Sequence, residues 1–313
     1  MEHMRLIFAG TPEVAIPALA ALIDAGHEIA LVLTQPDAKG KRGSDLHPSP
    51  VKQYALDHDL TVETPARPSA PEFVERVRAI RADAAGVVAY GQILRPSLIA
   101  ATAHGWVNLH FSLLPAWRGA APVQRALQAG DDLTGASTFL IGEGIDTGPV
   151  IGQVTERIKP ADTAGELLDR LAKVGARLLV DSIEAVGDGF ARPQPQSEEG
   201  VSHAAKLSRD DALVRWDLPA HVIDRAIRAC TPAPGAWTTL PDGSSAKIGP
   251  VVAVDGLATT PGLVRATEEG IVVGTGGKPV MLSWIQPAGK KVMDARDWWR
   301  GARWADGVLL GEA

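Results

Sequence analysis

Apolar runs alternate with helix-period segments along the first 190 residues. Residues 4–9 form an apolar run that predicts a buried strand, Gly10-Thr-Pro predicts a turn, and residues 14–25 have the helical period, ending at Gly26. Further apolar runs predict strands over 28–34, 84–90 and 106–110, and a long amphipathic stretch predicts a helix over 164–186. This alternation requires crossover connections, so we expect an α/β domain with a Rossmann-like, mainly parallel sheet.

The pattern changes after residue 187, where proline, glycine and charged residues replace the apolar period. Residues 220–230 predict a short helix, and the remaining chain predicts short strands separated by turns at 241–243, 268–270 and 276–278. Such a series suits a small OB-fold-like β-barrel. We therefore expect a catalytic domain over 1–189, a linker over 190–207 and a C-terminal domain over 208–313, in agreement with the length of 313 residues.

Composition narrows the class of protein. The N-terminus lacks a basic segment followed by an apolar one, and no run of about 18 apolar residues occurs, so we expect a cytoplasmic protein that does not bind membranes. The single cysteine, Cys230, excludes an internal disulfide, and no Cys/His group has metal-ligand spacing, so we expect no metal. We also expect a monomer.

Net charge disfavours a general nucleic-acid binder such as a DNA-binding protein, because the chain carries −6. The charge is unevenly distributed. Residues 201–313 hold 13 Lys and Arg against 12 Asp and Glu, whereas residues 1–200 have a net charge of −7. A polyanion would therefore meet basic patches mainly in the C-terminal part.

An Asn-x-His pattern lies on the predicted strand over 106–110. The strand period of two puts Asn108, His110 and Ser112 on one face, with successive side chains roughly 6.6 Å apart, so an amide and an imidazole can flank one reacting carbonyl. The strand ends at Ser112-Leu113-Leu114-Pro115, and ligands of open parallel sheets bind beyond such ends. Taken alone, the pattern is more typical of a solvated strand face.

Asp146 is surrounded by Gly142, Gly144 and Gly148, which predict a tight or flexible loop. The alternative is a turn aspartate that bonds only its own backbone. The sequence Asp146-Thr-Gly also occurs in aspartic proteases, but these need two such carboxylates and an all-β fold, so we reject that class. Residues 10–15 lack the Gly-x-Gly-x-x-Gly pattern and no Walker loop occurs, so we expect no nucleotide cofactor.

The segment Asn108-Leu-His-Phe-Ser-Leu-Leu-Pro-Ala-Trp-Arg-Gly-Ala-Ala-Pro, with Gly144-Ile-Asp-Thr-Gly after it, resembles the folate-dependent formyltransferase family. Both domains are similar to those members of the family that act on methionyl-tRNA. The further matching segments, in the family's order, are Phe8-Ala-Gly-Thr-Pro, Thr34-Gln-Pro-Asp, Pro48-Ser-Pro-Val-Lys, Val88-Ala-Tyr-Gly, Ala205-Lys-Leu-Ser and Gln286-Pro-Ala-Gly-Lys-Lys.

The resemblance implies a donor, an acceptor and a catalytic trio. The donor is 10-formyltetrahydrofolate, and the acceptor is the α-amino group of methionine on initiator tRNA, giving formylmethionyl-tRNA for translation initiation. Asn108, His110 and Asp146 are the implied catalytic residues, and Ser112, Leu113, Leu114 and Pro115 the folate-binding turn. Asn108 and a protonated His110 would donate hydrogen bonds to the formyl oxygen, while Asp146 stabilises the imidazolium and assists proton movement.

The resemblance also implies a tRNA-contacting loop over 37–45, with Lys39, Lys41 and Arg42 on phosphates or bases, although a solvated loop is the alternative. Further candidates for backbone contacts are Lys206, Lys290 and Lys291. The sequence departs from many relatives at Phe111, where we expect core packing, and at Ala116, where an arginine is common.

Two other functions compete with this one. A formyltransferase acting on an amino-sugar nucleotide or a ribonucleotide amine shares the Asn, His and Asp core, but the C-terminal barrel and the basic loop argue against it. A tRNA-binding protein with a vestigial active site is the alternative from another class, and the intact trio argues against that.

Overall fold

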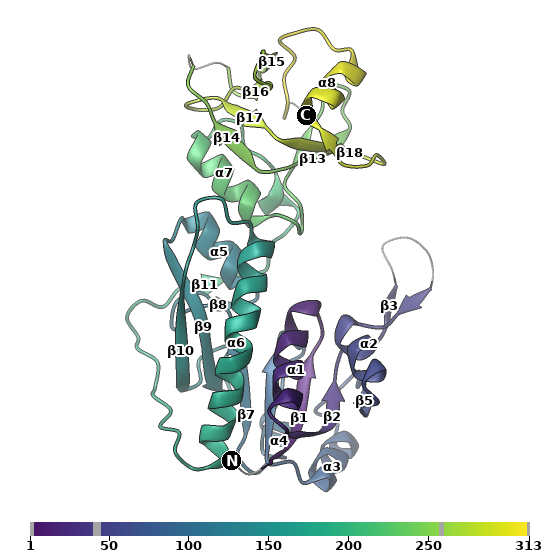
Figure 1. Cartoon of the computed structure of the whole chain (residues 1–313), viewed down its shortest axis with the longest axis vertical. Helices are drawn as coiled ribbons and strands as arrows, with labels where there is room; N and C mark the ends of the chain where they lie inside the picture. Colours follow the sequence, from purple (N-terminus) through teal and green to yellow (C-terminus); the bar gives the residue numbers. More distant parts are fainter. Residues whose placement is uncertain (1–2, 40–44, 257–259, 312–313) are drawn as a thin grey trace. The chain divides into compact units, whose positions relative to one another are not determined.

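The computed structural model describes residues 3–39, 45–256 and 260–311, and the chain divides into two compact units (Figure 1). The first unit combines Met1–Pro122, Leu133–Arg157 and Leu168–Ala204, and the second combines the rest, Val123–Asp132, Ile158–Leu167 and Ala205–Ala313. The domain boundaries expected from the sequence stay a prediction.

A seven-stranded sheet forms the centre of the first unit. Its strands are, in spatial order, β10 (Val150–Arg157), β9 (Leu133–Leu140), β7 (Trp106–His110), β6 (Ala84–Val88), β1 (Arg5–Gly10), β2 (Glu28–Leu33) and β5 (Val62–Glu63). The five strands from β7 to β5 are parallel, which confirms the predicted mainly parallel sheet. The sequence pattern did not predict β9 and β10, which are antiparallel.

The polar composition of β9 explains why its pattern gives no strand signal. Thr134, Ser137 and Thr138 are buried in that strand, each at most 3% exposed, so β9 lacks the continuous apolar run of a central strand. The hydroxyl of Ser137 both accepts and donates a hydrogen bond. A strand with several buried polar side chains gives no continuous hydrophobic signal.

Helices cover both faces of this sheet. The helical segments of the first unit are η1 (Glu13–Ala15), α1 (Ile16–Asp24), α2 (Pro50–Asp57), α3 (Pro71–Ile80), α4 (Pro96–Ile99) and most of α6 (Ala164–Gly187). Gly175 of α6 lies directly against Leu109 of β7, since a Cβ at that glycine would be 3.0 Å from the leucine methyl groups. Trp106, on the opposite parity of β7, instead packs with Val77 of α3 and Leu98 of α4.

This packing decides which way the two candidate residues of β7 face. Asn108 and His110 share the parity of Trp106, so they project from the face opposite Leu109 and α6. Neither belongs to the apolar cluster that Trp106 forms with α3 and α4. At the carboxyl end of β7, the side chains of Asn108 and His110 are therefore not packed in the apolar core and can make polar contacts.

Two short strand pairs complete the first unit. They are β3 (Ala38–Lys39) with β4 (Leu46–His47), and β8 (Arg118–Gly119) with β11 (His203–Ala204). The β3–β4 pair is antiparallel and flanks the basic loop, whereas β8 and β11 are parallel. The second pair joins residues far apart in the sequence, next to the end of β7.

The second unit contains two antiparallel sheets of four strands each. One has the order β12 (Trp237–Thr239), β13 (Ser245–Ile248), β18 (Trp284–Pro287) and β19 (Met293–Asp294), and the other β14 (Val251–Ala253), β17 (Val280–Leu282), β16 (Ile271–Val273) and β15 (Val264–Ala266). Its helical segments are α5 (Pro122–Ala129), η2 (Asp210–Ala212), α7 (Ala220–Ala229) and α8 (Ala295–Ala302). One apolar cluster, including Trp216, Ile223 and Trp298, fills this unit. The predicted fold class, a Rossmann-like domain followed by a small OB-fold-like domain, is confirmed.

A buried histidine, His27, makes the stability of the first unit depend on pH. His27 is 6% exposed, its Nδ1 accepts a hydrogen bond from the Met4 amide at 3.3 Å, and its Nε2 lies 3.6 Å from a Glu184 carboxylate oxygen. Burial lowers the pKa of the His27 imidazole, and the Glu184 carboxylate opposes this only in part, while His3 adds to it. The ring therefore stays neutral in the folded protein where the unfolded chain takes up a proton.

We predict that acid weakens the fold through His27. As the pH falls through about 6.5, the unfolded chain binds a proton that the folded protein does not, so the free energy of unfolding decreases. Melting temperatures measured from pH 7.5 to 5.5 should fall less steeply for His27→Gln than for the wild type. His104→Gln, at an exposed histidine, is the matched control and should keep the wild-type slope. Equal slopes for all three proteins would contradict the prediction.

Candidate active site

His110 is the last residue of β7, and a backbone carbonyl fixes its ring. The side chain is 6% exposed, and its Nε2 lies 2.8 Å from the carbonyl oxygen of Trp117. Because a carbonyl oxygen only accepts hydrogen bonds, Nε2 is the donor in this contact and holds a proton. The other ring nitrogen, Nδ1, is not engaged by this carbonyl.

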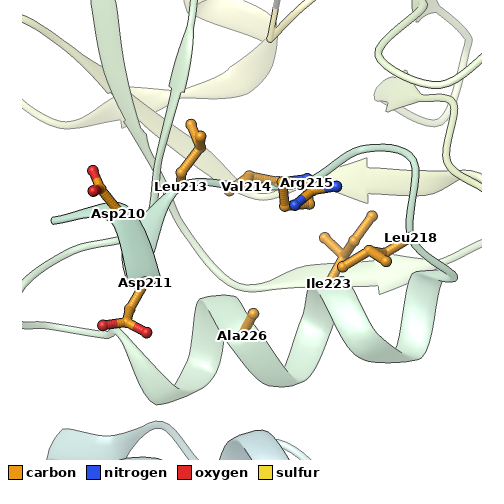
Figure 2. A pocket seen from close by; sticks show the side chains of 8 residues that line it. All are labelled: Asp210, Asp211, Leu213, Val214, Arg215, Leu218, Ile223 and Ala226. Carbon is orange, nitrogen blue, oxygen red and sulfur yellow. The ribbon is translucent and has the colours of Figure 1, made fainter. Parts of the chain in front are cut away.

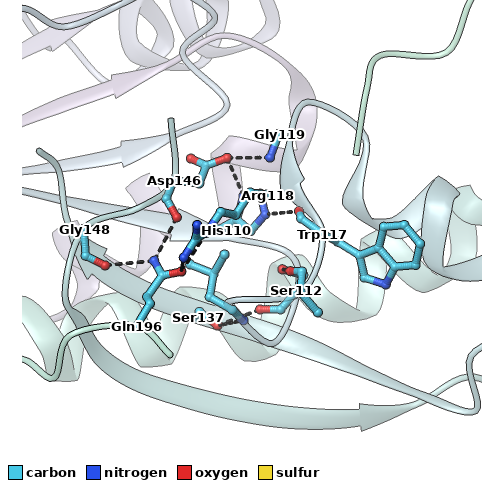
Figure 3. Close-up of polar contacts among 11 residues, drawn as sticks. His110, Ser112, Trp117, Arg118, Gly119, Ser137, Asp146, Gly148 and Gln196 are labelled. Carbon is cyan, nitrogen blue, oxygen red and sulfur yellow. Dashed lines mark hydrogen bonds and ion pairs between the residues drawn. The ribbon is translucent and has the colours of Figure 1, made fainter. Parts of the chain in front are cut away.

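Asp146 faces that second nitrogen (Figure 3). It lies in the connection between β9 and β10, with a left-handed backbone φ of 52°. Its Oδ2 accepts a hydrogen bond from the Gly119 amide at 2.8 Å and lies 3.7 Å from His110 Nδ1. The carboxylate is thus oriented by the backbone and close enough to stabilise a protonated imidazole, although it is too distant for a direct hydrogen bond.

Asn108 precedes His110 by two residues on the same face of β7. Its side chain is partly exposed, and none of the residues within 3–39, 45–256 and 260–311 forms a hydrogen bond to its amide. The alternation of the strand sets the two side chains roughly 6.6 Å apart. An amide donor is therefore available beside the imidazole.

Strand β7 has the bounds that the sequence predicts, 106–110, but the expected placement of Ser112 on the same face as Asn108 and His110 is wrong. Because β7 stops at His110, the alternation does not extend to Ser112, which is fully buried in the following turn. Phe111 is also buried, at 7% exposed, as predicted for core packing. Ala116 accepts a hydrogen bond from the Ser112 hydroxyl at its carbonyl, at 2.6 Å.

The turn from Ser112 to Pro115 is held by two side chains that sequence reasoning missed. The Ser137 hydroxyl donates to the Ser112 carbonyl at 2.6 Å and accepts from the Leu114 amide at 3.0 Å. The Gln153 amide donates to Ser137 Oγ and to the Leu114 carbonyl, both at 2.9 Å. Ser137 and Gln153 belong to β9 and β10, the two strands without an apolar signal, so no sequence pattern marked them.

Leu113 and Pro115 of this turn are partly exposed. Leu113 packs over Gly135, where an added Cβ would lie 2.5 Å from the leucine methyl group. Pro115 follows a cis peptide bond. The turn thus presents partly apolar surface beside the polar trio.

The described residues include four of the candidate tRNA contacts. Lys39 is exposed in β3, and Asp37 just before it pairs with Lys52 of α2 at 2.7 Å. Lys41 and Arg42 lie outside the described residues. Lys206, Lys290 and Lys291 are exposed in the second unit.

A small cavity of about 160 Å³ lies in the second unit, and Figure 2 shows the side chains that line it. Two of its charged lining residues already have partners, since Arg215 pairs with Asp217 and Asp211 with Arg125. Small-molecule sites usually exceed about 300 Å³, so this cavity is packing space. A groove of about 840 Å³ in the first unit, beside Ser69, Ile93 and Arg95, reaches the size of such sites.

No group of three or more His, Cys, Asp or Glu side chains suited to a metal ion occurs among the described residues. Across the same part of the chain, no helix is long and apolar enough to cross a membrane.

Comparison with known families accounts for nearly the whole chain. Residues 4–183 match the family described as Formyl transferase, and residues 206–303 match Formyl transferase, C-terminal domain. The methionyl-tRNA formyltransferase of Salinispora tropica is 53% identical over 308 residues, covering 98% of this chain and 100% of that protein. That of Streptomyces coelicolor is 52% identical over 310 residues, covering 99% and 100%.

Solved structures share the fold at low sequence identity. HypX from Aquifex aeolicus in complex with tetrahydrofolic acid has a TM-score of 0.69 and 15% identity, covering 100% of this chain and 51% of that one. An N-formyltransferase from Helicobacter canadensis, in complex with folinic acid and dTDP-3-aminofucose, has a TM-score of 0.67 and 17% identity, covering 91% and 99%.

Proposed function

The chain belongs to the methionyl-tRNA formyltransferase family, and from that premise we propose that it transfers the formyl group of 10-formyltetrahydrofolate to the α-amino group of methionyl initiator tRNA. The products are formylmethionyl-tRNA, used in translation initiation, and tetrahydrofolate. The observation that carries the proposal is the His110–Asp146 pair beside an unengaged Asn108 amide, at the carboxyl end of β7.

The reaction forms one bond and breaks another. The methionine nitrogen attacks the formyl carbon, the bond between that carbon and the folate N10 breaks, and a proton passes from the amine to N10. Negative charge develops on the formyl oxygen during the attack. The Asn108 amide donates a hydrogen bond to this oxygen, and a single such donor is typically worth about 10²- to 10³-fold in kcat.

We infer which nitrogen of His110 reacts from the contacts of its ring. Nε2 is engaged by the Trp117 carbonyl, so Nδ1 faces the reacting atoms when protonated and donates the second hydrogen bond to the oxygen. Asp146 Oδ2, 3.7 Å away, stabilises the imidazolium and assists the proton transfer between the two substrate nitrogens. Neither step needs a covalent enzyme intermediate.

We assign the folate co-substrate to the turn Ser112, Leu113, Leu114 and Pro115. The backbone of this turn is fixed by Ser137 and Gln153, which suits a site that must hold the formyl carbon next to Asn108 and His110. Leu113 offers apolar surface for a flat ring system.

We assign the tRNA contacts to Lys39, Lys41 and Arg42 of the basic loop and to Lys206, Lys290 and Lys291. Ammonium and guanidinium groups bind phosphates without reading sequence, so these side chains would position the acceptor end for the reaction. We further propose that the enzyme acts as a monomer in the cytoplasm, with tRNA as its only nucleic-acid partner.

Removing any of the three catalytic side chains should slow formylation of methionyl-tRNA. We expect kcat to fall about 10²- to 10³-fold in Asn108→Ala and His110→Ala, and about 10²- to 10⁴-fold in Asp146→Ala. Steady-state kinetics with 10-formyltetrahydrofolate measure this, with His104→Ala as the control at an exposed histidine. Near wild-type kcat in both the His110 and Asp146 variants would refute the assignment.

The same assay identifies the acceptor. The wild type should formylate methionyl-tRNA and leave uncharged tRNA, amino-sugar nucleotides and ribonucleotide amines unmodified. Formylation of an amino-sugar nucleotide or a ribonucleotide amine instead would support the alternative acceptor class. No formylation of any acceptor would support a tRNA-binding protein with a vestigial site.

The proposed cationic contacts predict a steep salt dependence. Each phosphate contact releases counterions, so the logarithm of the apparent tRNA affinity should fall linearly with the logarithm of salt concentration. The KM for methionyl-tRNA, measured between 50 and 200 mM salt (roughly the range over which such contacts are resolved), should rise steeply. Substituting Lys290 and Lys291 together by Ala should make the slope shallower. A KM that does not change with salt would contradict these contacts.

A further inference from the structure

The chain segment after α6 returns to the site from two sides. Near the start of this segment, the backbone of Gln194 exchanges two hydrogen bonds of 2.8 Å with that of Val150, at the start of β10. At its end, β11 pairs with β8, and the Ala121 amide donates to the Ala204 carbonyl at 3.1 Å. We call residues 196–204 the strap. It borders both the loop that contains Asp146 and the turn that contains Trp117.

Gln196 binds the Asp146 loop and the Trp117 turn at once (Figure 3). Its side-chain nitrogen donates to the carbonyl oxygens of Asp146 and Gly148, both at 2.8 Å. Its side-chain oxygen accepts from Arg118 Nε at 2.9 Å and from Arg118 Nη2 at 2.7 Å. The full hydrogen-bonding capacity of the amide is used, which fixes its orientation.

Ser202 binds the turn whose Trp117 carbonyl contacts His110 Nε2. Its hydroxyl accepts a hydrogen bond from the Trp117 amide at 2.9 Å, and its carbonyl accepts from the Arg118 amide at 2.9 Å. The Trp117 carbonyl in turn accepts from His110 Nε2. The strap therefore supports both groups that flank the His110 ring, through different residues.

The backbone at these two contacts is strained. Trp117 has a φ of 60° and Asp146 a φ of 52°, and both lie in the left-handed region that non-glycine residues rarely adopt. Strained residues of this kind persist only where their surroundings hold them. In both cases a strap residue bonds the strained peptide directly, Ser202 at the Trp117 amide and Gln196 at the Asp146 carbonyl.

The close fit extends to Gly119. Its φ is 123°, and a Cβ there would lie 2.7 Å from the Ala204 carbonyl oxygen, so β11 approaches the turn as closely as a glycine allows. The Gly119 amide is the group that donates to Asp146 Oδ2. The strap thus sets the position of the Gly119 amide, which donates to the carboxylate, and also the position of the loop that contains Asp146.

We propose that the strap positions the His110–Asp146 pair, and that Gln196 is a positioning residue that sets the Asp146 carboxylate against His110 Nδ1. The proposal rests on the formyl-transfer function assigned above. Gln196 acts through Asp146 and does not touch the substrates. A small displacement of a catalytic group can cost about 10²-fold in rate, so the effect belongs in kcat.

Gln196→Ala tests the proposal with Gln194→Ala as its matched control. The Gln194 side chain donates only to the nearby Arg192 carbonyl, so its loss leaves the Asp146 loop intact. We expect kcat for methionyl-tRNA to fall about 10- to 100-fold in Gln196→Ala, with KM changed less than about 3-fold, and no change in Gln194→Ala. An unchanged kcat in Gln196→Ala would overturn the proposal.

Gln196→Glu tests the contacts of the side-chain nitrogen separately from those of the side-chain oxygen. A carboxylate keeps the contact with Arg118 but has no N–H for the Asp146 and Gly148 carbonyls. We expect kcat to fall as in Gln196→Ala. Wild-type kcat in Gln196→Glu would show that the two carbonyl contacts do not position Asp146.

A double-mutant cycle distinguishes positioning from a general structural role. If Gln196 acts through Asp146, then Gln196→Ala should lower kcat by less than about 2-fold in the Asp146→Ala background, because the group that it positions is already absent. Rate losses that multiply in the double variant would overturn the proposal.

Hydrogen exchange tests the same proposal without any turnover. The peptide over residues 141–150 should exchange faster in Gln196→Ala than in the wild type and in Gln194→Ala, since the loop has lost two anchors. Equal exchange in all three proteins would overturn the proposal. A wild type that formylates no methionyl-tRNA would overturn the proposed function instead, and the exchange result would still decide the role of Gln196.

Discussion

One hydrogen bond, from His110 Nε2 to the Trp117 carbonyl, determines what the rest of the site can do. It fixes the plane of a buried ring, and it leaves Nδ1 as the nitrogen that faces Asp146. The carbonyl is itself held in place, because Trp117 has a left-handed backbone and its amide is bonded to Ser202. The chemistry assigned to the imidazole therefore depends on a backbone conformation set several residues further along the chain.

The sheet brings the remaining groups to this ring. Asn108 and His110 project from one face of β7 because Leu109 packs against Gly175 of α6 on the other. Asp146 arrives from the connection of the antiparallel strands β9 and β10, which lie beyond β7 at the edge of the parallel sheet. The same two strands provide Ser137 and Gln153 for the turn that follows β7. Two antiparallel strands added to a parallel sheet thus supply both the carboxylate beside His110 and the side chains that hold the proposed folate turn.

Much of this architecture follows from the sequence pattern, because apolar runs mark the buried parallel strands and the amphipathic period marks α6. The pattern also predicts that Asn108 and His110 share a face. It fails where buried groups are polar, as at Ser137, and where contacts are made by backbone, as along the strap. Asp146 approaches His110 because the hairpin of β9 and β10 pairs with β7, a contact between segments distant in sequence. Only the family resemblance pointed to this approach. Gln196 had no sequence signal, since its segment lacks any apolar period.

The tautomer of His110 tests the central claim most directly. Nitrogen-15 NMR of the labelled protein, with His110→Gln to assign the signals, reports which ring nitrogen bears the proton when the imidazole is neutral. The account predicts a protonated Nε2 and an unprotonated Nδ1, because the Trp117 carbonyl can only accept. A neutral ring protonated at Nδ1 would contradict it, since His110 would then lack the anchor from which its role is derived.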